Sequence, residues 1–357
     1  MTETDVLPSD IYEPEPPRSH RRLGVVLLAL LATFVIVVAA GFFWFNGKAN
    51  PSGPQGQAVT FVIPPGSSTA YIAAVLDQKK VITSARLFRY YLKFRGKGPF
   101  QAGEYTFHEH SSFGAATSVL SRGPTVVVQK LTIPEGYTLK QIAAKVGTLP
   151  NRSADKFLAV AASGQIRSNY EPAGSNNLEG LVFPDTYFVR PNDDEAAILQ
   201  RMVSEFDSRA AAAGIDDAAT KVGISPYQAI ILASMIEREA KIDEDRGKVA
   251  QVIYNRLHKN MLLQIDATVV YALGGNKTRV LYSDLKVESP YNTYLHKGLP
   301  PGPISSPGSA ALNAAMNPTP GTWLFYVVID AQGHHAFANT DAEQQANIRL
   351  AQQRGVR

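Results

Sequence analysis

Cysteine is absent from the 357 residues of this chain. Disulfide bonds, thiolate nucleophiles and zinc sites built on cysteine are therefore excluded, although no cellular compartment is. Histidine is sparse, with seven residues, and the adjacent pair His334 and His335 has no partner at metal-ligand spacing. We therefore expect no metal site. Hydrophobic residues make up 45% of the chain, which is enough for a real core and for more than one domain.

Charge is missing altogether from residues 23–45. This stretch exceeds the roughly 20 apolar residues that cross a bilayer and is longer than the apolar core of a signal peptide. Its last five residues, 41–45, are mostly aromatic, as in an anchor at the membrane interface. The pattern predicts a single uncleaved transmembrane helix.

The flanks of this helix predict its orientation. Residues 1–22 form a polar tail with a net charge of −2, and its arginines Arg18, Arg21 and Arg22 stand just before the apolar run. The positive-inside rule places this disordered tail in the cytoplasm and the rest of the chain outside. Residues 46–57 contain Pro51, Gly53, Pro54 and Gly56 and are expected to form a flexible linker.

A repeat follows the linker. Residues 63–66 read Ile-Pro-Pro-Gly and residues 133–136 read Ile-Pro-Glu-Gly, and each block precedes an Ile-Ala-Ala triplet, at 72–74 and 142–144. Each copy is typical of a short strand, a Pro-Gly turn and an amphipathic helix. The first copy falls in residues 58–126, which we interpret as a small α/β subdomain, and the second opens a mixed α+β domain at residues 127–357. The whole chain is therefore expected to be α+β.

The most informative stretch begins at Ser225. Ser225, Pro226 and Gln228 form a helix start with a capping box, and residues 229–236 are almost continuously apolar, so this helix is expected to be buried. It ends in Glu237 and Glu239. Burying an unpaired carboxylate is costly and raises its pKa, which suits a general acid near neutral pH. The alternative is a helix end open to solvent, with both glutamates hydrated.

The two glutamates lie on different faces, because two residues are about half a helical turn. Glu239 follows Leu232, Met235 and Ile236 at helical spacing, whereas Glu237 follows a less bulky row. The pattern therefore favours Glu239 as the acid with the raised pKa. Asp243 is expected to cap the next helix, whose apolar positions run to Leu257.

Five linked blocks resemble one family. The blocks LASMIEREA, DRGKVAQVIYNRL, LLQIDATVVYALG, SPYNTY and GLPPGPISSPG stand in the order and spacing of the endolytic murein transglycosylases, the MltG or YceG-like family. The resemblance extends from the apolar segment to the C-terminus. The second glutamate of the family's Glu-Lys-Glu motif is its catalytic residue, and it matches Glu239, with Arg238 in place of the lysine. The first subdomain resembles the family's LysM-like subdomain, which either binds glycan or only positions the catalytic domain.

The same resemblance suggests substrate-binding residues. The block at 178–187 matches a family block, in which Asp185 and Tyr187 either bind sugar hydroxyls or form a turn; Glu179 is a weaker candidate for a second carboxylate. Asp266 is a plausible helix N-cap, and a rigid loop with aromatic and amide groups suits sugars. The remaining candidates for substrate contact are Gln264, Asp266, Thr268, Tyr291, Asn292 and Tyr294.

The C-terminal part is expected to hold a buried strand at 322–329, a turn at 330–333, a returning strand with His335 and Phe337, and a last helix at 341–353. The resemblance implies cleavage of the MurNAc–GlcNAc bond of peptidoglycan glycan strands with 1,6-anhydro-MurNAc ends and without a cofactor. It also implies an inner-membrane enzyme that works beside peptidoglycan synthases and division or elongation proteins and terminates glycan elongation. No nucleic-acid partner is expected. A glycan hydrolase with Glu237, Glu179 or Asp185 as second carboxylate, and a non-catalytic cell-wall scaffold, are the alternatives.

The charge pattern makes a topological prediction. A reporter that is active only in the cytoplasm should be silent when it is fused after residue 357, because the arginines before residue 23 hold that end inside. Bright reporter cells would show that the orientation is reversed.

Overall fold

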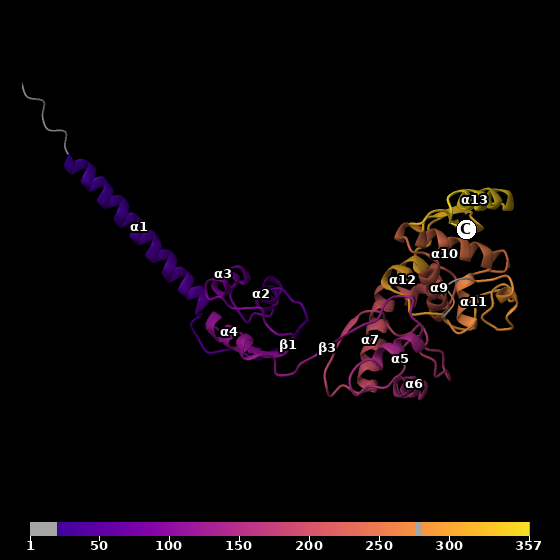
Figure 1. Cartoon of the computed structure of the whole chain (residues 1–357), viewed down its shortest axis with the longest axis horizontal. Helices are drawn as coiled ribbons and strands as arrows, with labels where there is room; N and C mark the ends of the chain where they lie inside the picture. The colour runs from indigo at the N-terminus through magenta and orange to yellow at the C-terminus, as the bar shows by residue number, and fades with distance from the viewer. Residues whose placement is uncertain (1–19, 276, 278–279, 357) are drawn as a thin grey trace, which may run out of the picture. The chain divides into compact units, whose positions relative to one another are not determined.

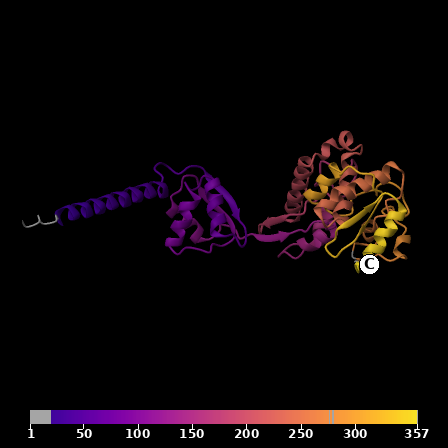
Figure 2. The ribbon, with the colours of Figure 1, turned by 90° about the horizontal axis from the view of Figure 1, so that it is seen from above.

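The computed structural model describes residues 20–275, 277 and 280–356, so most of the predicted tail at 1–22 lies outside the described residues. The chain divides into two compact units, Met1–Thr125 and Val126–Arg357. Both contain helices and two-stranded antiparallel sheets, which makes the fold α+β (Figures 1 and 2).

Unit 1 begins with the apolar helix. This helix, α1 (His20–Ala49), is longer than the predicted 23–45 and includes a candidate membrane span at Val25–Ala49. The remaining elements of the unit are β1 (Ala58–Ile63), α2 (Thr69–Gln78), α3 (Ala85–Phe94), β2 (Gly103–His108) and α4 (Phe113–Arg122). Strands β1 and β2 pair along their full lengths, from Ala58 opposite His108 to Ile63 opposite Gly103.

The core of unit 1 is aromatic. Tyr105 and Phe107 on β2 are fully buried and stack with ring centroids 5.9 Å apart. These two aromatics of the predicted LysM-like subdomain therefore belong to its core and are not exposed to a sugar. Phe45, near the end of α1, packs against Phe113 of the same core, and Ala49 is buried in it. The last turn of α1 is thus part of the globular unit.

Unit 2 is built around one buried helix. Its elements before that helix are β3 (Gln129–Thr132), α5 (Leu139–Val146), α6 (Ala154–Ala162), β4 (Thr186–Val189), α7 (Glu195–Ala212), η1 (Ile215–Asp217) and α8 (Ala218–Lys221). The buried helix and its successors are α9 (Pro226–Glu239), α10 (Asp243–His258), α11 (Asp266–Ala272), η2 (Asp284–Lys286), α12 (Ser309–Met316), β5 (Phe325–Val328), β6 (His335–Ala338) and α13 (Asp341–Gln353). Helices α10, α11 and α12 all contact α9, and Figure 1 shows them gathered around it.

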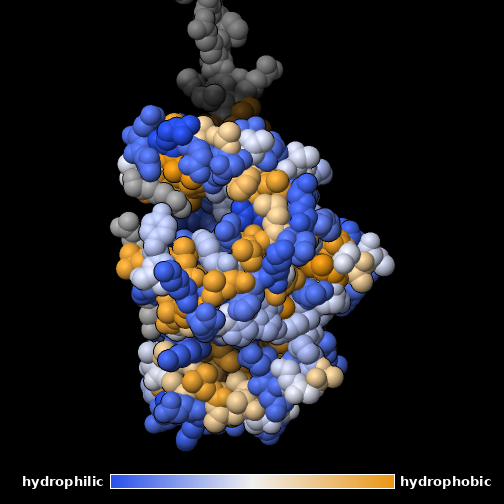
Figure 3. All heavy atoms as spheres, turned by 90° about the vertical axis from the view of Figure 1, so that its right-hand side faces the viewer, coloured by the Kyte–Doolittle hydropathy of each residue, from blue (hydrophilic) through white to orange (hydrophobic). Residues whose placement is uncertain are grey.

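Both copies of the repeat have the expected order of strand, turn and helix. Gly66 and Gly136 adopt φ of +79° and +74°, a left-handed conformation that favours glycine, and this explains the shared Pro-Gly turn. The strand predicted at 322–329 is shorter, at 325–328, where each residue has a partner in β6. On the face of unit 2 in Figure 3, apolar residues lie in separate patches among hydrophilic ones.

The fold makes a prediction about truncation. A chain that lacks residues 1–45 should be soluble and unfold cooperatively, because both cores lie after this segment except for the contact of Phe45. Calorimetry and analytical ultracentrifugation measure this. An aggregated product without a cooperative transition would contradict the division of the chain at this point.

Candidate functional site

Helix α9 places Glu239 at its last position. Ser225 accepts the N–H of Gln228 and the Gln228 side chain accepts the N–H of Ser225, so the predicted capping box is confirmed. Residues 229–236 are all buried, and the helix ends where Ala240 turns to an extended conformation. An apolar helix with no solvent-facing side thus delivers its terminal carboxyl into the protein.

The Glu239 carboxyl has few but well-placed partners. The Tyr326 hydroxyl donates to Glu239 Oε2 at 3.0 Å, and the backbone N–H of Ala267 also donates to the carboxyl. Burial raises the pKa of Glu239 to about 7, although these two donors act in the opposite direction and the nearby Asp266 carboxylate adds to the rise. The residue is still partly exposed, so a substrate atom can reach an acid that is about half protonated near neutral pH.

Asp266 lies next to this carboxyl but does not cap α11. Ile265 is the N-cap residue, Asp266 is the first helical residue, and no side-chain cap bond forms, so the predicted capping role was wrong. The exposed Asp266 carboxylate instead accepts the Tyr294 hydroxyl at 2.6 Å. Two predicted substrate residues, Asp266 and Tyr294, are thus joined beside Glu239.

Asp243 likewise is the first residue of α10 rather than its cap, and it pairs with Arg246.

The β5–β6 hairpin holds Tyr326 in place. Asp245 accepts the backbone N–H of His335 at 2.8 Å and contacts His335 Nδ1 at 3.2 Å. The His335 ring meets the Tyr326 ring edge-on, with centroids 5.4 Å apart. Burial lowers the pKa of His335, and burial together with Glu239 raises the pKa of Tyr326 well above its usual value. Tyr326 therefore stays a protonated donor.

Sequence reasoning missed Tyr326 as a site residue. It is one aromatic in a short strand that reads as buried, and its contact with Glu239 spans 87 residues of sequence. The pairing of β5 with β6, the link from α10 to His335 and the hydrogen bond from Gln344 of α13 to the Tyr326 carbonyl all hold Tyr326 near the end of α9, and no local sequence pattern predicts these contacts.

Glu237 points away from Glu239 into a polar network. Its Oε1 accepts from Arg246 at 3.2 Å, and its Oε2 accepts the backbone N–H of Gly308 at 2.9 Å. The Glu135 side chain lies close to Gly308, where a Cβ would displace it, so Glu135 and Glu237 both meet the start of α12. Burial and the neighbouring Glu237 raise the pKa of Glu135. Glu237 therefore ties α9 to α10 and α12.

A second buried carboxyl is Glu179. Its Oε1 accepts the N–H of Leu139 at 3.0 Å and its Oε2 faces the Tyr271 hydroxyl at 3.4 Å. Burial raises its pKa to about 7 as well. The rings of Tyr271 and Tyr291 lie 4.8 Å apart, which places the predicted substrate residue Tyr291 with Glu179. Glu179, the weaker candidate for a second carboxylate, is thus a buried residue between Leu139 and Tyr271.

Other predicted substrate residues serve the scaffold. The buried Thr268 hydroxyl donates to the carbonyl of Ile265 and lies 2.9 Å from the Thr293 hydroxyl. The buried Asn292 amide donates to the carbonyls of Leu285 and Val287. Their polar groups are used within the protein, where they fix the 291–294 loop to α11. The Gln264 side chain is exposed, and its backbone N–H donates to the Thr293 carbonyl.

Asp185 and Tyr187 contact a different part of unit 2. The Asp185 carbonyl accepts the N–H of Ile133 next to β3, and the Tyr187 hydroxyl donates to the Phe183 carbonyl at 2.8 Å. The charged neighbours of Tyr187 include Glu205 and Arg209 of α7.

Within residues 20–275, 277 and 280–356, no group of three His, Asp or Glu side chains is close enough to hold a metal ion.

The two buried carboxyls allow a matched pKa prediction. Tyr326→Phe removes a donor that favours the carboxylate, so the pKa of Glu239 should rise above about 7 while that of Glu179 stays unchanged. Tyr271→Phe should raise the pKa of Glu179 alone. Carbon-13 NMR titration of labelled glutamate side chains measures both. An unchanged or lower pKa of Glu239 in Tyr326→Phe would contradict this arrangement.

Comparisons with known proteins show which family the chain belongs to. The model of the YceG-like family matches residues 61–350. The endolytic murein transglycosylase of Bacillus subtilis (strain 168) is 33% identical over 320 residues, which cover 85% of this chain and 88% of that protein. The endolytic murein transglycosylase of Streptococcus pneumoniae serotype 2 (strain D39 / NCTC 7466) is 27% identical, and the match covers 92% of this chain and 65% of that protein.

A solved structure shares the fold. The 2.6 Å crystal structure of the yceG-like protein lmo1499 from Listeria monocytogenes superposes with a TM-score of 0.56 and 34% sequence identity, covering 81% of this chain and 98% of that one. The family model spans most of both units, and the B. subtilis protein is similar over nearly its whole length. This chain therefore belongs to the YceG-like family.

Proposed function

We propose that this protein is an endolytic peptidoglycan transglycosylase that cleaves the MurNAc–GlcNAc β-1,4 bond within glycan strands. The observation that carries the proposal is the environment of the Glu239 carboxyl. Two hydrogen-bond donors hold it, burial raises its pKa to about 7, and the residue is still partly exposed. The names of the B. subtilis and S. pneumoniae relatives support the same activity.

A single carboxyl performs both proton transfers in the proposed reaction. Protonated Glu239 gives its proton to the glycosidic oxygen as the C1–O bond breaks, and the GlcNAc 4-hydroxyl leaves. The resulting carboxylate then takes the proton of the C6 hydroxyl of the same MurNAc, whose oxygen bonds to C1. The product carries a 1,6-anhydro-MurNAc end, the glutamate is protonated again, and no water or cofactor is consumed. A pKa near ambient pH suits both halves of this cycle.

The surrounding residues support these steps. Tyr326 and the N–H of Ala267 hold the carboxyl and stabilise its ionised form between the two transfers. Asp266 and Tyr294 stand beside Glu239 and offer a carboxylate and a phenol to sugar hydroxyls. The exposed Gln264 adds an amide near the same loop. We retain Tyr291, Asp185 and Tyr187 as contacts for more distant parts of the strand.

Hydrolysis is the second candidate, and one observation favours it. Glycosidases that use water or a nucleophile need a second carboxylate near the acid. Asp266 is an exposed carboxylate that acts electrostatically on Glu239, whereas Glu237 is tied to Arg246 and Gly308. Asp266 therefore replaces the three carboxylates that the sequence suggested for this role.

The unit organisation suggests how the enzyme reaches its substrate. Helix α1 is long and apolar enough to span a membrane, and we place it in the cytoplasmic membrane with residues 50–357 outside. Unit 1 acts as the LysM-like spacer between the anchor and the catalytic unit. An anchored enzyme of this kind would meet nascent strands beside peptidoglycan synthases and the division or elongation proteins, and its cleavage would terminate elongation.

Replacing Glu239 by Gln tests the proposal. The variant keeps the shape but cannot transfer a proton, so cleavage of purified peptidoglycan should fall by about 10²–10⁴-fold or more. The fold should persist. A folded-state pKa above the unfolded one destabilises the native state as pH rises from about 4.5 towards 7, so the neutral Gln should melt no lower than the native chain above pH 7.

Two control variants sharpen this test. Glu244→Gln changes an exposed glutamate five positions on and should leave both activity and melting temperature unchanged. Glu237→Gln should lower the melting temperature, because it removes the charge of the buried one of the two carboxylates that pair with the buried Arg246, while folded molecules keep most of their activity. Near-normal cleavage by Glu239→Gln would overturn the proposed function.

A further inference from the structure

Unit 1 carries a positively charged segment on and around α3. Residues 78–103 contain seven lysines and arginines and no aspartate or glutamate. Asp77, just before this segment, uses its carboxylate to accept the N–H of Ala85 at the start of α3. The catalytic proposal uses none of these cations.

The cations gather on the face of α3 that points away from the core. Phe88 and Leu92 are fully buried, whereas Arg86, Arg89 and Lys93 are exposed and follow one another at helical spacing. Beside them lies an exposed aromatic row. Tyr90 is 50% exposed and Phe94 is 89% exposed. A helix with a buried apolar face therefore presents cations and aromatic rings to its surroundings.

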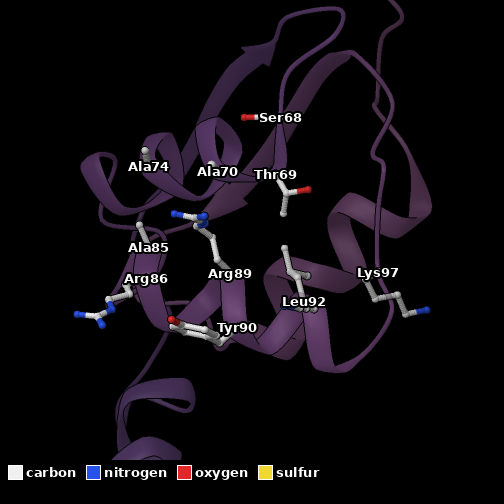
Figure 4. Close-up of a pocket in the computed structure, with 11 residues that line it drawn as sticks. Ser68, Thr69, Ala70, Ala74, Ala85, Arg86, Arg89, Tyr90, Leu92 and Lys97 are labelled. Carbon is white, nitrogen blue, oxygen red and sulfur yellow. The ribbon is translucent and has the colours of Figure 1, made fainter.

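A groove of about 810 Å³ runs between this face and the start of α2 (Figure 4). In Figure 4 the Arg89 side chain extends from α3 towards α2 near Ala70, while Arg86 and Lys97 extend outward at its two sides. Guanidinium and ammonium groups donate hydrogen bonds and accept none, so their natural ligand is an anion rich in acceptor oxygens, such as a phosphate.

The groove lies close to the end of the apolar helix. The Thr83 hydroxyl donates to the carbonyl of Lys48 at 2.5 Å, and Thr83 stands two residues before α3. Phe45 and Ala49 pack into the core of unit 1, and Figure 1 shows α3 beside the C-terminal end of α1. If α1 crosses the membrane as proposed, the bilayer surface lies next to α3.

We propose that the exposed face of α3, with Arg86, Arg89, Lys93, Tyr90 and Phe94, docks on the phosphate groups of anionic phospholipids in the leaflet next to unit 1. This inference rests on the proposed membrane anchoring but not on the catalytic activity. Basic residues near an anionic leaflet each strengthen binding roughly fivefold, and exposed aromatic rings settle at the headgroup level. The docking holds unit 1 against the membrane and fixes the direction in which the chain leaves it.

Glycan is the less favoured ligand for this face. Sugar sites combine aromatic platforms with groups that both donate and accept hydrogen bonds, whereas the charged groups of this face, Arg86, Arg89 and Lys93, only donate and carry a net positive charge that favours an anion over a neutral sugar. The stacked pair of unit 1, Tyr105 and Phe107, is buried.

Dye quenching in vesicles tests the docking. Because the chain has no cysteine, Ala74→Cys in the full-length protein, at an exposed position that lines the groove but is not one of the five docking residues, carries a single environment-sensitive dye. The protein is reconstituted into vesicles of phosphatidylcholine, alone or with about one third phosphatidylglycerol, that contain a nitroxide quencher at headgroup depth. Either orientation of the protein places unit 1 beside a leaflet of the same composition, so mixed orientation does not disturb the readout.

Quenching should be several-fold stronger in the anionic vesicles than in the neutral ones. This difference should vanish in about 1 M salt, where the Debye length is about 3 Å. The triple variant Arg86→Glu, Arg89→Glu, Lys93→Glu should abolish the difference. The triple variant Lys140→Glu, Lys145→Glu, Lys156→Glu makes the same charge change at exposed positions of unit 2 and should keep it.

Three results would overturn the proposal. Equal quenching in neutral and anionic vesicles would show that the α1 tether alone brings the dye near the membrane. Protection of the dye by added glycan strands, and not by anionic lipid, would identify a glycan-binding face. A chain that fails to float with vesicles at all would refute the membrane anchoring and this inference with it, while leaving the catalytic proposal intact.

Discussion

The arrangement of unit 2 depends on one carboxyl that is expensive to bury. Residues 229–236 of helix α9 are buried on every side, so the helix ends inside the protein and water cannot fully solvate the carboxyl of its last residue, Glu239. The Tyr326 hydroxyl and the N–H of Ala267 offset part of this cost, and they come from two segments that are distant in sequence. Because the two hydrogen bonds offset only part of the effect of burial, the pKa of Glu239 is about 7 instead of about 4.5. A pKa close to the working pH is what a group that both gives and takes a proton requires.

Several polar contacts outside the site keep those donors in position. Asp245 fixes the β5–β6 hairpin through His335, and Thr268 joins α11 to the 291–294 loop through Thr293. Glu179 shows that a raised pKa alone does not identify a catalytic group. Its pKa is also about 7, but Glu179 is a buried residue with 7% of its surface exposed, and its oxygens face Leu139 and Tyr271. The greater residue exposure of Glu239 separates the candidate acid from the buried Glu179.

Local patterns predicted much of this structure. The capping box at Ser225, the buried run of α9, the bounds of α13 and the two Pro-Gly turns follow from short-range rules, as does the divergence of Glu237 and Glu239. The partners of Glu239 could not be predicted, because Tyr326 reaches it through a strand pairing and Asp266 through the orientation of α11. The two expected caps, Asp243 and Asp266, are the first helical residues and not the N-caps, and their carboxylates bind Arg246 and Tyr294 instead of the helix backbone.

The central claim is that Glu239 alone moves the proton and that the C6 hydroxyl of the substrate, not water, is the nucleophile. The most direct measurement is mass spectrometry of glycan products formed from purified peptidoglycan in water enriched in oxygen-18. The account predicts 1,6-anhydro-MurNAc ends without any heavy oxygen at the new terminus. Reducing ends that carry the label would show that water attacks C1, with Asp266 as the nearest candidate for the second carboxylate, and would contradict the single-carboxyl mechanism.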